Sequence, residues 1–147
     1  MPKNDGKLTE RIFDAQFKDE TARDINFVYY KFIDSHAARN LVQNQPADRL
    51  IIYMGTVILT EIKSSYDPMR FPLKNISKKQ IGTGRRWVAA GTKSMFIIHR
   101  LQTNEFFFVP LTEVLKKMDS GHKSWKWSEL EYFKHEATYA FWKRYGN

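Results

Sequence analysis

Two acids and a lysine are spaced so that they could act together on a phosphate group. Asp48 comes just before one short apolar run, and Glu61 and Lys63 come just after the next one. The two runs are rich in β-branched and aliphatic residues and flank Met54-Gly55, so they predict a β-hairpin. Because side chains alternate between the two faces of a strand, Glu61 and Lys63 share a face. The spacing therefore predicts that all three charges converge.

The register of this hairpin depends on its turn. If Met54-Gly55 is a two-residue turn, Asp48 lies directly opposite Glu61. If the turn is Gly55-Thr56, which suits a type II′ geometry, Asp48 lies opposite Lys63 and diagonal to Glu61. Both registers bring the three charges onto one face. A surface hairpin whose charges are simply solvated is the alternative, because the pattern is short and its residue types are common.

Two carboxylates that face each other repel unless something positive lies between them. Their Cβ atoms would be about 5 Å apart, a span that a hard divalent cation with oxygen ligands can bridge. Mg²⁺ fits, with Mn²⁺ as a substitute, because it prefers one or two carboxylates together with water and phosphate oxygens. Lys63 could then hold a water molecule or a phosphate oxygen. The chemistry predicted is metal-assisted hydrolysis of a phosphodiester.

The elements that must position these residues follow from periodicity and turn signals along the chain. Helices are expected at 7–20 and 78–90, the latter capped by Ser77, and a short one follows the second hairpin. Strands are expected at 25–33, in the hairpin above, and at 95–101 and 105–109. This order predicts an α/β fold, a mixed β-sheet flanked by helices. We expect one domain over 1–147, ending in an aromatic helical tail at about 122–147.

Positive charge is concentrated in one part of the chain. The net charge is +8, and no Asp or Glu occurs between Pro68 and Asn104. A polyanion is the expected partner, and nucleic acid is the commonest one. An ordinary solvated basic face is the alternative. The predicted DNA-binding residues are Arg70, Lys74, Lys78, Lys79, Arg85 and Arg86.

The sequence also bears on where the protein acts. It has no cysteine, so neither disulfides nor a thiolate metal site is expected. No apolar stretch approaches the roughly 20 residues of a membrane span. The first ten residues lack the apolar region of a signal peptide. These features favour a cytoplasmic protein with no membrane partner.

The spacing of Asp48, Glu61 and Lys63 resembles the PD-(D/E)-x-K nuclease signature. The run FPLKNISKKQI at 71–81 resembles the segment that follows this signature in RecU-type Holliday junction resolvases and their phage relatives. The resemblance extends from Glu10 to about Leu115. It implies a restriction-endonuclease-like fold, in which a mixed β-sheet is flanked by helices.

The resemblance also implies roles for individual residues. Glu10, which the helix dipole alone could explain as an acid in a first turn, would complete the acidic cluster. Lys63 would orient the attacking water or stabilise charge that develops on the phosphate. Gln80 matches a family glutamine that borders the site. The implied catalytic residues are Glu10, Asp48, Glu61, Lys63 and Gln80, and the implied metal ligands are Glu10, Asp48, Glu61 and the carbonyl of Ile62.

The function that follows from the resemblance is a Mg²⁺-dependent endonuclease that cuts branched DNA, especially four-way junctions, in a bacterial or phage-infected cell. Resolution of a junction needs two nicks at symmetric positions, so a homodimer is expected. One alternative is a nuclease of the same fold that acts on flaps, nicks or linear duplex. Another is a non-catalytic nucleic-acid-binding module, which would explain the charge but not the convergence of the acids.

Overall fold

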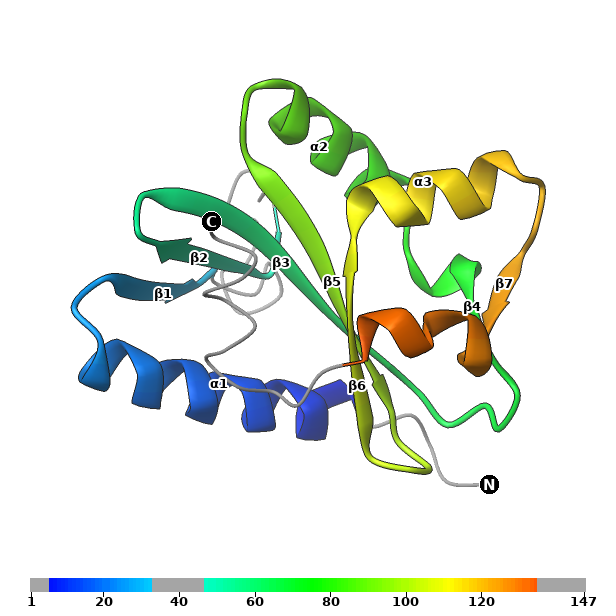
Figure 1. Ribbon diagram of the computed structural model, residues 1–147, viewed down its shortest axis with the longest axis horizontal. Helices are drawn as coiled ribbons and strands as arrows, with labels where there is room; N and C mark the ends of the chain where they lie inside the picture. Colours follow the sequence, from blue (N-terminus) through cyan, green and yellow to red (C-terminus); the bar gives the residue numbers. More distant parts are fainter. Residues whose placement is uncertain (1–5, 33–46, 135–147) are drawn as a thin grey trace, which may run out of the picture.

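A five-stranded mixed sheet forms the centre of the computed structural model, which describes residues 6–32 and 47–134 (Figure 1). The strand order is β1-β2-β3-β5-β6, and only β3 and β5 run parallel. The strands are β1 (Phe27–Lys31), β2 (Arg49–Tyr53), β3 (Thr56–Ser65), β5 (Lys93–Arg100) and β6 (Glu105–Pro110).

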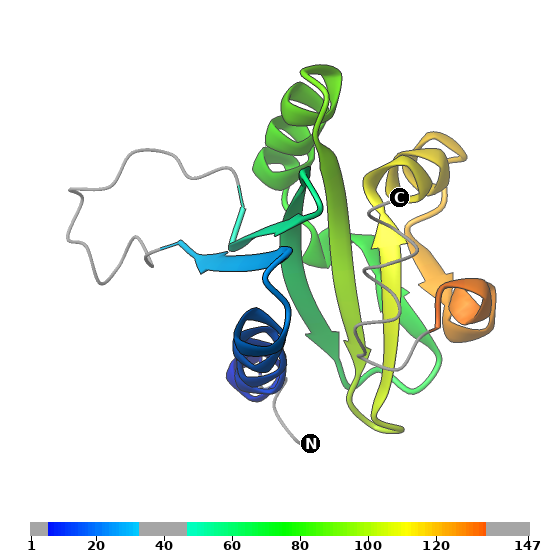
Figure 2. The same cartoon turned by 60° about the vertical axis from the view of Figure 1, so that its left-hand side comes forward.

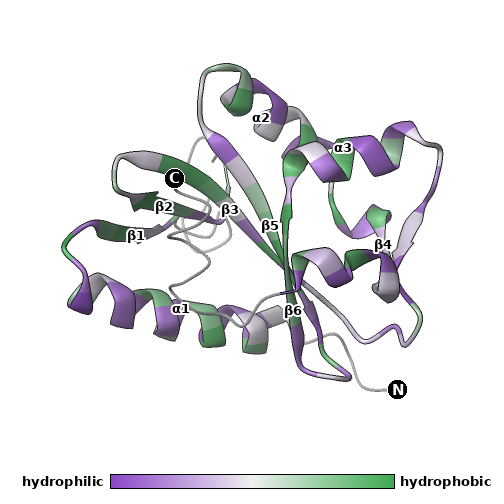
Figure 3. Cartoon of the chain, viewed as in Figure 1, coloured by the Kyte–Doolittle hydropathy of each residue, from purple (hydrophilic) through white to green (hydrophobic). Residues whose placement is uncertain are grey.

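Helices cover both faces of this sheet. Helix α1 (Gly6–Arg23) lies on one face, and α2 (Lys78–Ala89) and α3 (Leu111–Asp119) lie on the other (Figures 1 and 2). A buried apolar cluster lies on each face, and hydrophobic residues run along the strands while hydrophilic ones recur along the helices (Figure 3). The predicted mixed β-sheet flanked by helices is therefore confirmed. In the described ranges, no helix is long and apolar enough to cross a membrane.

The β2–β3 hairpin has the first of the two predicted registers. Met54 and Gly55 both have positive φ, at 49° and 83°, as a type I′ turn requires at its two central residues. Tyr53 pairs with Thr56, and Arg49 with Thr60. The turn between two apolar runs thus fixes which residues face each other at the far end of the hairpin.

Helix α2 begins at Lys78, as the sequence predicts, and ends at Ala89, one residue before the predicted end. The Ser77 hydroxyl accepts the backbone N–H of Gln80 at 3.1 Å, and the Gln80 side chain accepts the Ser77 N–H at 3.0 Å. This reciprocal capping box satisfies two backbone donors that the first turn leaves without helical partners. Beyond the C-cap, Gly91 has a φ of 107°, which favours glycine.

The prediction that the aromatic tail is helical from its start is wrong. Residues Ser124–Lys126 form strand β7, which pairs with β4 (Arg70–Pro72). The 3₁₀-helices η1 (Leu73–Asn75) and η2 (Trp127–Phe133) follow these strands. Aromatic packing explains the strand, because the Phe71 ring lies 6.5 Å from that of Trp125 and 6.1 Å from that of Trp127, between centroids. The remainder of the predicted tail, 135–147, lies outside the described residues.

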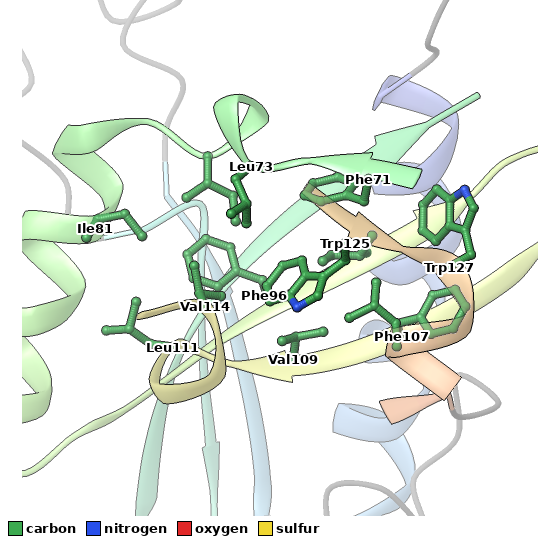
Figure 4. Close-up of a cluster of buried hydrophobic side chains, with 13 residues drawn as sticks. Phe71, Leu73, Ile81, Phe96, Phe107, Val109, Leu111, Val114, Trp125 and Trp127 are labelled. Carbon is green, nitrogen blue, oxygen red and sulfur yellow. The ribbon is translucent and has the colours of Figure 1, made fainter. Parts of the chain in front are cut away.

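The β4–β7 ribbon and η2 close the core on the side of α2 and α3. Their side chains point toward those of the sheet in Figure 4. The cluster contains Phe71, Leu73, Ile76, Ile81, Phe96, Ile98, Phe107, Val109, Leu111, Val114, Trp125, Trp127 and Leu130. The described part of the tail is thus part of the domain core.

Candidate active site

The two acids of the predicted site lie where β2 and β3 separate. The last residues paired across this hairpin are Arg49 and Thr60, while β3 continues to Ser65. Asp48 immediately precedes β2 and therefore lies opposite Glu61. The backbone carbonyl of Asp48 accepts the N–H of Phe32, the residue that follows β1, at 3.0 Å. The structure thus brings Asp48 and Glu61 together, as the shorter turn predicts.

Glu61 is buried beside a second carboxyl group. Only 6% of its surface is exposed, and burial, together with the hydrogen bond and negative charge of Asp48, raises the pKa of Glu61 to about 9. The positive charge of Lys63 and a hydrogen bond from the Asp48 backbone act in the opposite direction but are weaker. The pair therefore retains a proton at neutral pH, which a divalent cation between the two groups would displace.

The side chain of Gln80 forms a hydrogen bond with the Glu61 carboxyl group. Its Nε2 donates to Oε2 of Glu61 at 3.1 Å, while its Oε1 is engaged in the capping box of α2. One amide therefore connects the first turn of α2 to the acidic pair on β3. The predicted place of Gln80 at the border of the site agrees with this contact.

Glu10 lies elsewhere. Its Oε1 is 3.4 Å from Nη2 of Arg49, and Arg49, next to Asp48 in β2, points to the opposite face of the sheet, toward α1. Among the residues that the structure describes, no group of three His, Cys, Asp or Glu side chains is placed to hold a metal ion. The structure thus does not bring Glu10 into the cluster with Asp48 and Glu61.

The partner of Glu10 belongs to a buried ion-pair network that the sequence did not reveal. Arg49 is 2% exposed and donates to both carboxylate oxygens of Asp14, from Nε at 3.0 Å and from Nη2 at 3.1 Å. Burial alone would raise the pKa of Asp14, but hydrogen bonds from Arg49 and Tyr29 outweigh it and lower that pKa. The available signal was the spacing of Glu10 and Asp14, one helical turn apart.

The remaining predicted site residues are Ile62, Lys63 and the six basic residues expected to bind DNA. The Ile62 side chain is buried in the cluster under α1, so only its backbone carbonyl could serve the site. Lys63 is half-buried on the same side of β3 as Glu61. The predicted DNA-binding side chains are all exposed: Arg70 in β4, Lys74 in η1, and Lys78, Lys79, Arg85 and Arg86 in α2.

The acidic pair suits a hard divalent cation. It offers carboxylate oxygens from Asp48 and Glu61, and oxygen donors of this kind are what Mg²⁺ prefers. Burial, and then the hydrogen bond and negative charge of Asp48, raise the pKa of Glu61, and a divalent cation between the two carboxyl groups would relieve the same repulsion. The residues present therefore fit a magnesium site built on two carboxylates.

Comparisons with known proteins place the chain in a family. The family model of RecU, Recombination protein U, matches residues 22–143. Among solved structures, the chain is similar to Hjc, a Holliday junction resolvase of the archaeal hyperthermophile Archaeoglobus fulgidus, with a TM-score of 0.47 and 11% identity over 72% of this chain and 75% of that one. No curated protein sequence matches it.

The extent of the family match differs from the one predicted. It begins after Glu10 and continues past Leu115 into the aromatic tail. Residues 122–143 of the tail are thus within the family match, and Glu10 is not. Because the family model matches most of the chain, the protein belongs to the RecU family.

Proposed function

We propose that this protein is a Mg²⁺-dependent endonuclease that hydrolyses phosphodiester bonds in branched DNA, above all in four-way junctions. The observation that carries the proposal is the pair formed by the buried Glu61 and the half-buried Asp48, with Lys63 on the same face. The preference for junctions rests on the resemblance to RecU-type resolvases and on membership in a family of recombination proteins. The resemblance also implies action in the cytoplasm of a bacterial or phage-infected cell.

The metal would be held by the carboxylates of Asp48 and Glu61 and by the carbonyl of Ile62, with Mn²⁺ able to replace Mg²⁺. When bound, such an ion stabilises negative charge on the phosphate and makes a bound water more acidic. Glu10 could join these ligands only if its carboxylate left Arg49.

The chain's own residues would prepare the reaction. The Lys63 ammonium orients the attacking water or stabilises charge that develops on the phosphate oxygens. Gln80 fixes one oxygen of Glu61, and such outer contacts of a metal ligand typically matter ten- to a hundredfold for affinity or activity. The exposed basic residues hold DNA phosphates without reading sequence. A homodimer would present two such sites for symmetric nicks.

The test is incubation of a labelled four-way junction with the protein and Mg²⁺, followed by a denaturing gel. Paired nicks at symmetric positions are expected. Replacing Mg²⁺ with Ca²⁺ should preserve binding and stop cutting, since Ca²⁺ accepts looser coordination. Vigorous cleavage in EDTA would contradict the metal requirement.

A matched pair of lysine variants separates chemistry from binding. Lys63→Ala should abolish cleavage and leave junction binding largely intact, whereas Lys116→Ala, at an exposed position on α3, should change neither. Linear duplex of the same sequence should be cut more slowly than the junction. Equal rates would favour a nuclease for flaps, nicks or linear DNA, and binding without cutting in any metal would favour a non-catalytic module.

A further inference from the structure

Gly82 lies at the centre of the exposed basic face of α2. Lys78, Lys79, Arg85 and Arg86 stand four or three residues before and after it, and residues at these spacings are nearest neighbours on a helix surface. We call these five residues the Gly82 face. All five are exposed, and α2 lies at the outside of the fold (Figures 1 and 2).

The fold itself gives no reason for a glycine at this position. A Cβ added to Gly82 would meet no atom within 4 Å, and its φ is not positive. Gly84, two residues later and on the buried side of the same helix, is different: its added Cβ would lie 2.9 Å from Leu111 and 3.3 Å from Ser94. Glycine is unfavourable inside a helix, so packing explains Gly84 but leaves Gly82 unexplained.

Three of the four positive charges around Gly82 are available to a ligand. Helix α2 contains no Asp or Glu. Within the described ranges, Lys78, Arg85 and Arg86 form no ion pair with a carboxylate. Cations therefore surround Gly82, which has no side chain. This arrangement suits an anion that comes close to the helix backbone.

The Gly82 face is turned away from the acidic pair. At 100° per residue, Gly82 lies roughly 160° around the helix from Gln80, whose side chain donates to Glu61. A helix with its side chains is about 10 Å wide. An anion held at Gly82 is therefore separated from Glu61 by the body of the helix.

We propose that the Gly82 face is a seat for a DNA backbone phosphate other than the one that is cut. The missing side chain lets the DNA backbone approach α2 closely, and Lys78, Arg85 and Arg86 neutralise the phosphate charge. This inference rests on the proposed function, since DNA is taken as the ligand. It adds to that function a second point of contact, through which a different segment of the branched DNA is held.

The test replaces Gly82 with alanine or leucine, which leaves the net charge unchanged. Because both residues favour a helix more than glycine does, the melting temperature of Gly82→Ala should rise by about 2–4 °C. The junction Kd, measured in Ca²⁺, should nevertheless increase about threefold for Gly82→Ala and tenfold or more for Gly82→Leu. The slope of log K against log salt should become shallower by about one or more, as expected for lost phosphate contacts. Ala90→Leu, at the exposed C-cap of the same helix, should bind like the wild type.

A kinetic measurement locates the seat relative to the chemistry. Single-turnover cleavage by Gly82→Leu should fall at low protein concentration but by less than about twofold at saturation. If a stable Gly82→Leu variant bound the junction with the wild-type Kd, the phosphate site at Gly82 would be contradicted. The nuclease proposal would be unaffected. A rate at saturation that falls as steeply as binding would show that the phosphate at Gly82 belongs to the cleavage site. A wild-type protein that binds no DNA would overturn both proposals.

Discussion

The side-chain amide of Gln80 joins α2 to the acidic pair: Nε2 donates to Glu61 at 3.1 Å, and Oε1 accepts the Ser77 N–H at 3.0 Å. The amide cannot rotate without losing one of these hydrogen bonds. The start of α2 therefore determines how the Glu61 carboxyl group is oriented. The same residue serves both helix capping and the site.

Exchange of this amide for a carboxylate separates its two roles. Gln80→Glu keeps an acceptor for the Ser77 N–H, so stability should stay close to that of the wild type. It replaces the donor to Glu61 with an acid, so cleavage should fall about ten- to a hundredfold. Gln80→Ala should lose about 1 kcal/mol of stability as well as cleavage. Urea unfolding and initial cleavage rates measure the two effects, and wild-type cleavage by Gln80→Glu would contradict this account.

The raised pKa of Glu61 predicts how stability depends on pH without metal. The folded protein keeps a proton on Glu61 up to about pH 9, whereas the unfolded chain loses it near 4.5. The folded state therefore binds more protons between these values, and its stability decreases as the pH rises through that window. Urea unfolding in EDTA at pH 5, 7 and 9 should show this decrease.

Glu61→Gln provides the control, because it removes the proton exchange and should flatten the pH dependence. Mg²⁺ should stabilise the wild type more at pH 8 than at pH 6, since the cation competes with the proton. Equal pH dependence in the two proteins would show that Glu61 does not titrate in this range.

The Arg49–Asp14 pair fastens α1 to the sheet next to Asp48. Asp14→Ala would remove two hydrogen bonds and leave the Arg49 guanidinium, 2% exposed, with Glu10 as its remaining acidic contact. Breaking a buried pair from one side costs about 3 kcal/mol or more. Asp19→Ala, whose pair with Arg23 is more than two-thirds exposed, should cost less than about 1 kcal/mol. Chemical unfolding measures the free energy of unfolding of both variants. Equal decreases in the two would contradict a structural role for the buried pair.

The packing of the β4–β7 ribbon predicts that β7 contributes to the stability of the core. Trp125 is 5% exposed and packs on Phe71, so Trp125→Ala should destabilise the protein by about 3–5 kcal/mol. Tyr132→Ala, at a residue that is 87% exposed, is the matched control and should have little effect. Thermal unfolding measures both, and a stable Trp125→Ala would mean that β7 is not required by the core.

Local signals made much of the site predictable. Both turns that the sequence allowed at Gly55 brought the acids onto one face, and the structure selects Met54-Gly55, whose two residues adopt positive φ. Ser77 and Gln80 fixed the start of α2 because capping acts within one turn. The place of Gln80 beside the acidic pair was implied by the family resemblance alone, because the contact joins two separate elements.

Contacts between distant segments were not predictable in the same way. Pairing of β4 with β7 joins residues near 70 to residues near 126, and no local pattern marks strands of three residues as partners. The helical periodicity of α1 also could not show whether Glu10 would turn to the acids or to Arg49. Arg49 alternates with Ile51 and Tyr53 on the face that packs against α1, but an arginine in a strand is usually exposed.

The central claim is that Asp48 and Glu61 together bind a divalent cation, and isothermal titration of Mn²⁺ tests it most directly. The wild type should bind Mn²⁺ at pH 7 and release about one proton, seen as a dependence of the heat on the buffer. Asp48→Asn should lose this binding, while Glu113→Gln, an acid variant on α3, should retain it. Unchanged Mn²⁺ binding by Asp48→Asn, or none by the wild type, would contradict the claim.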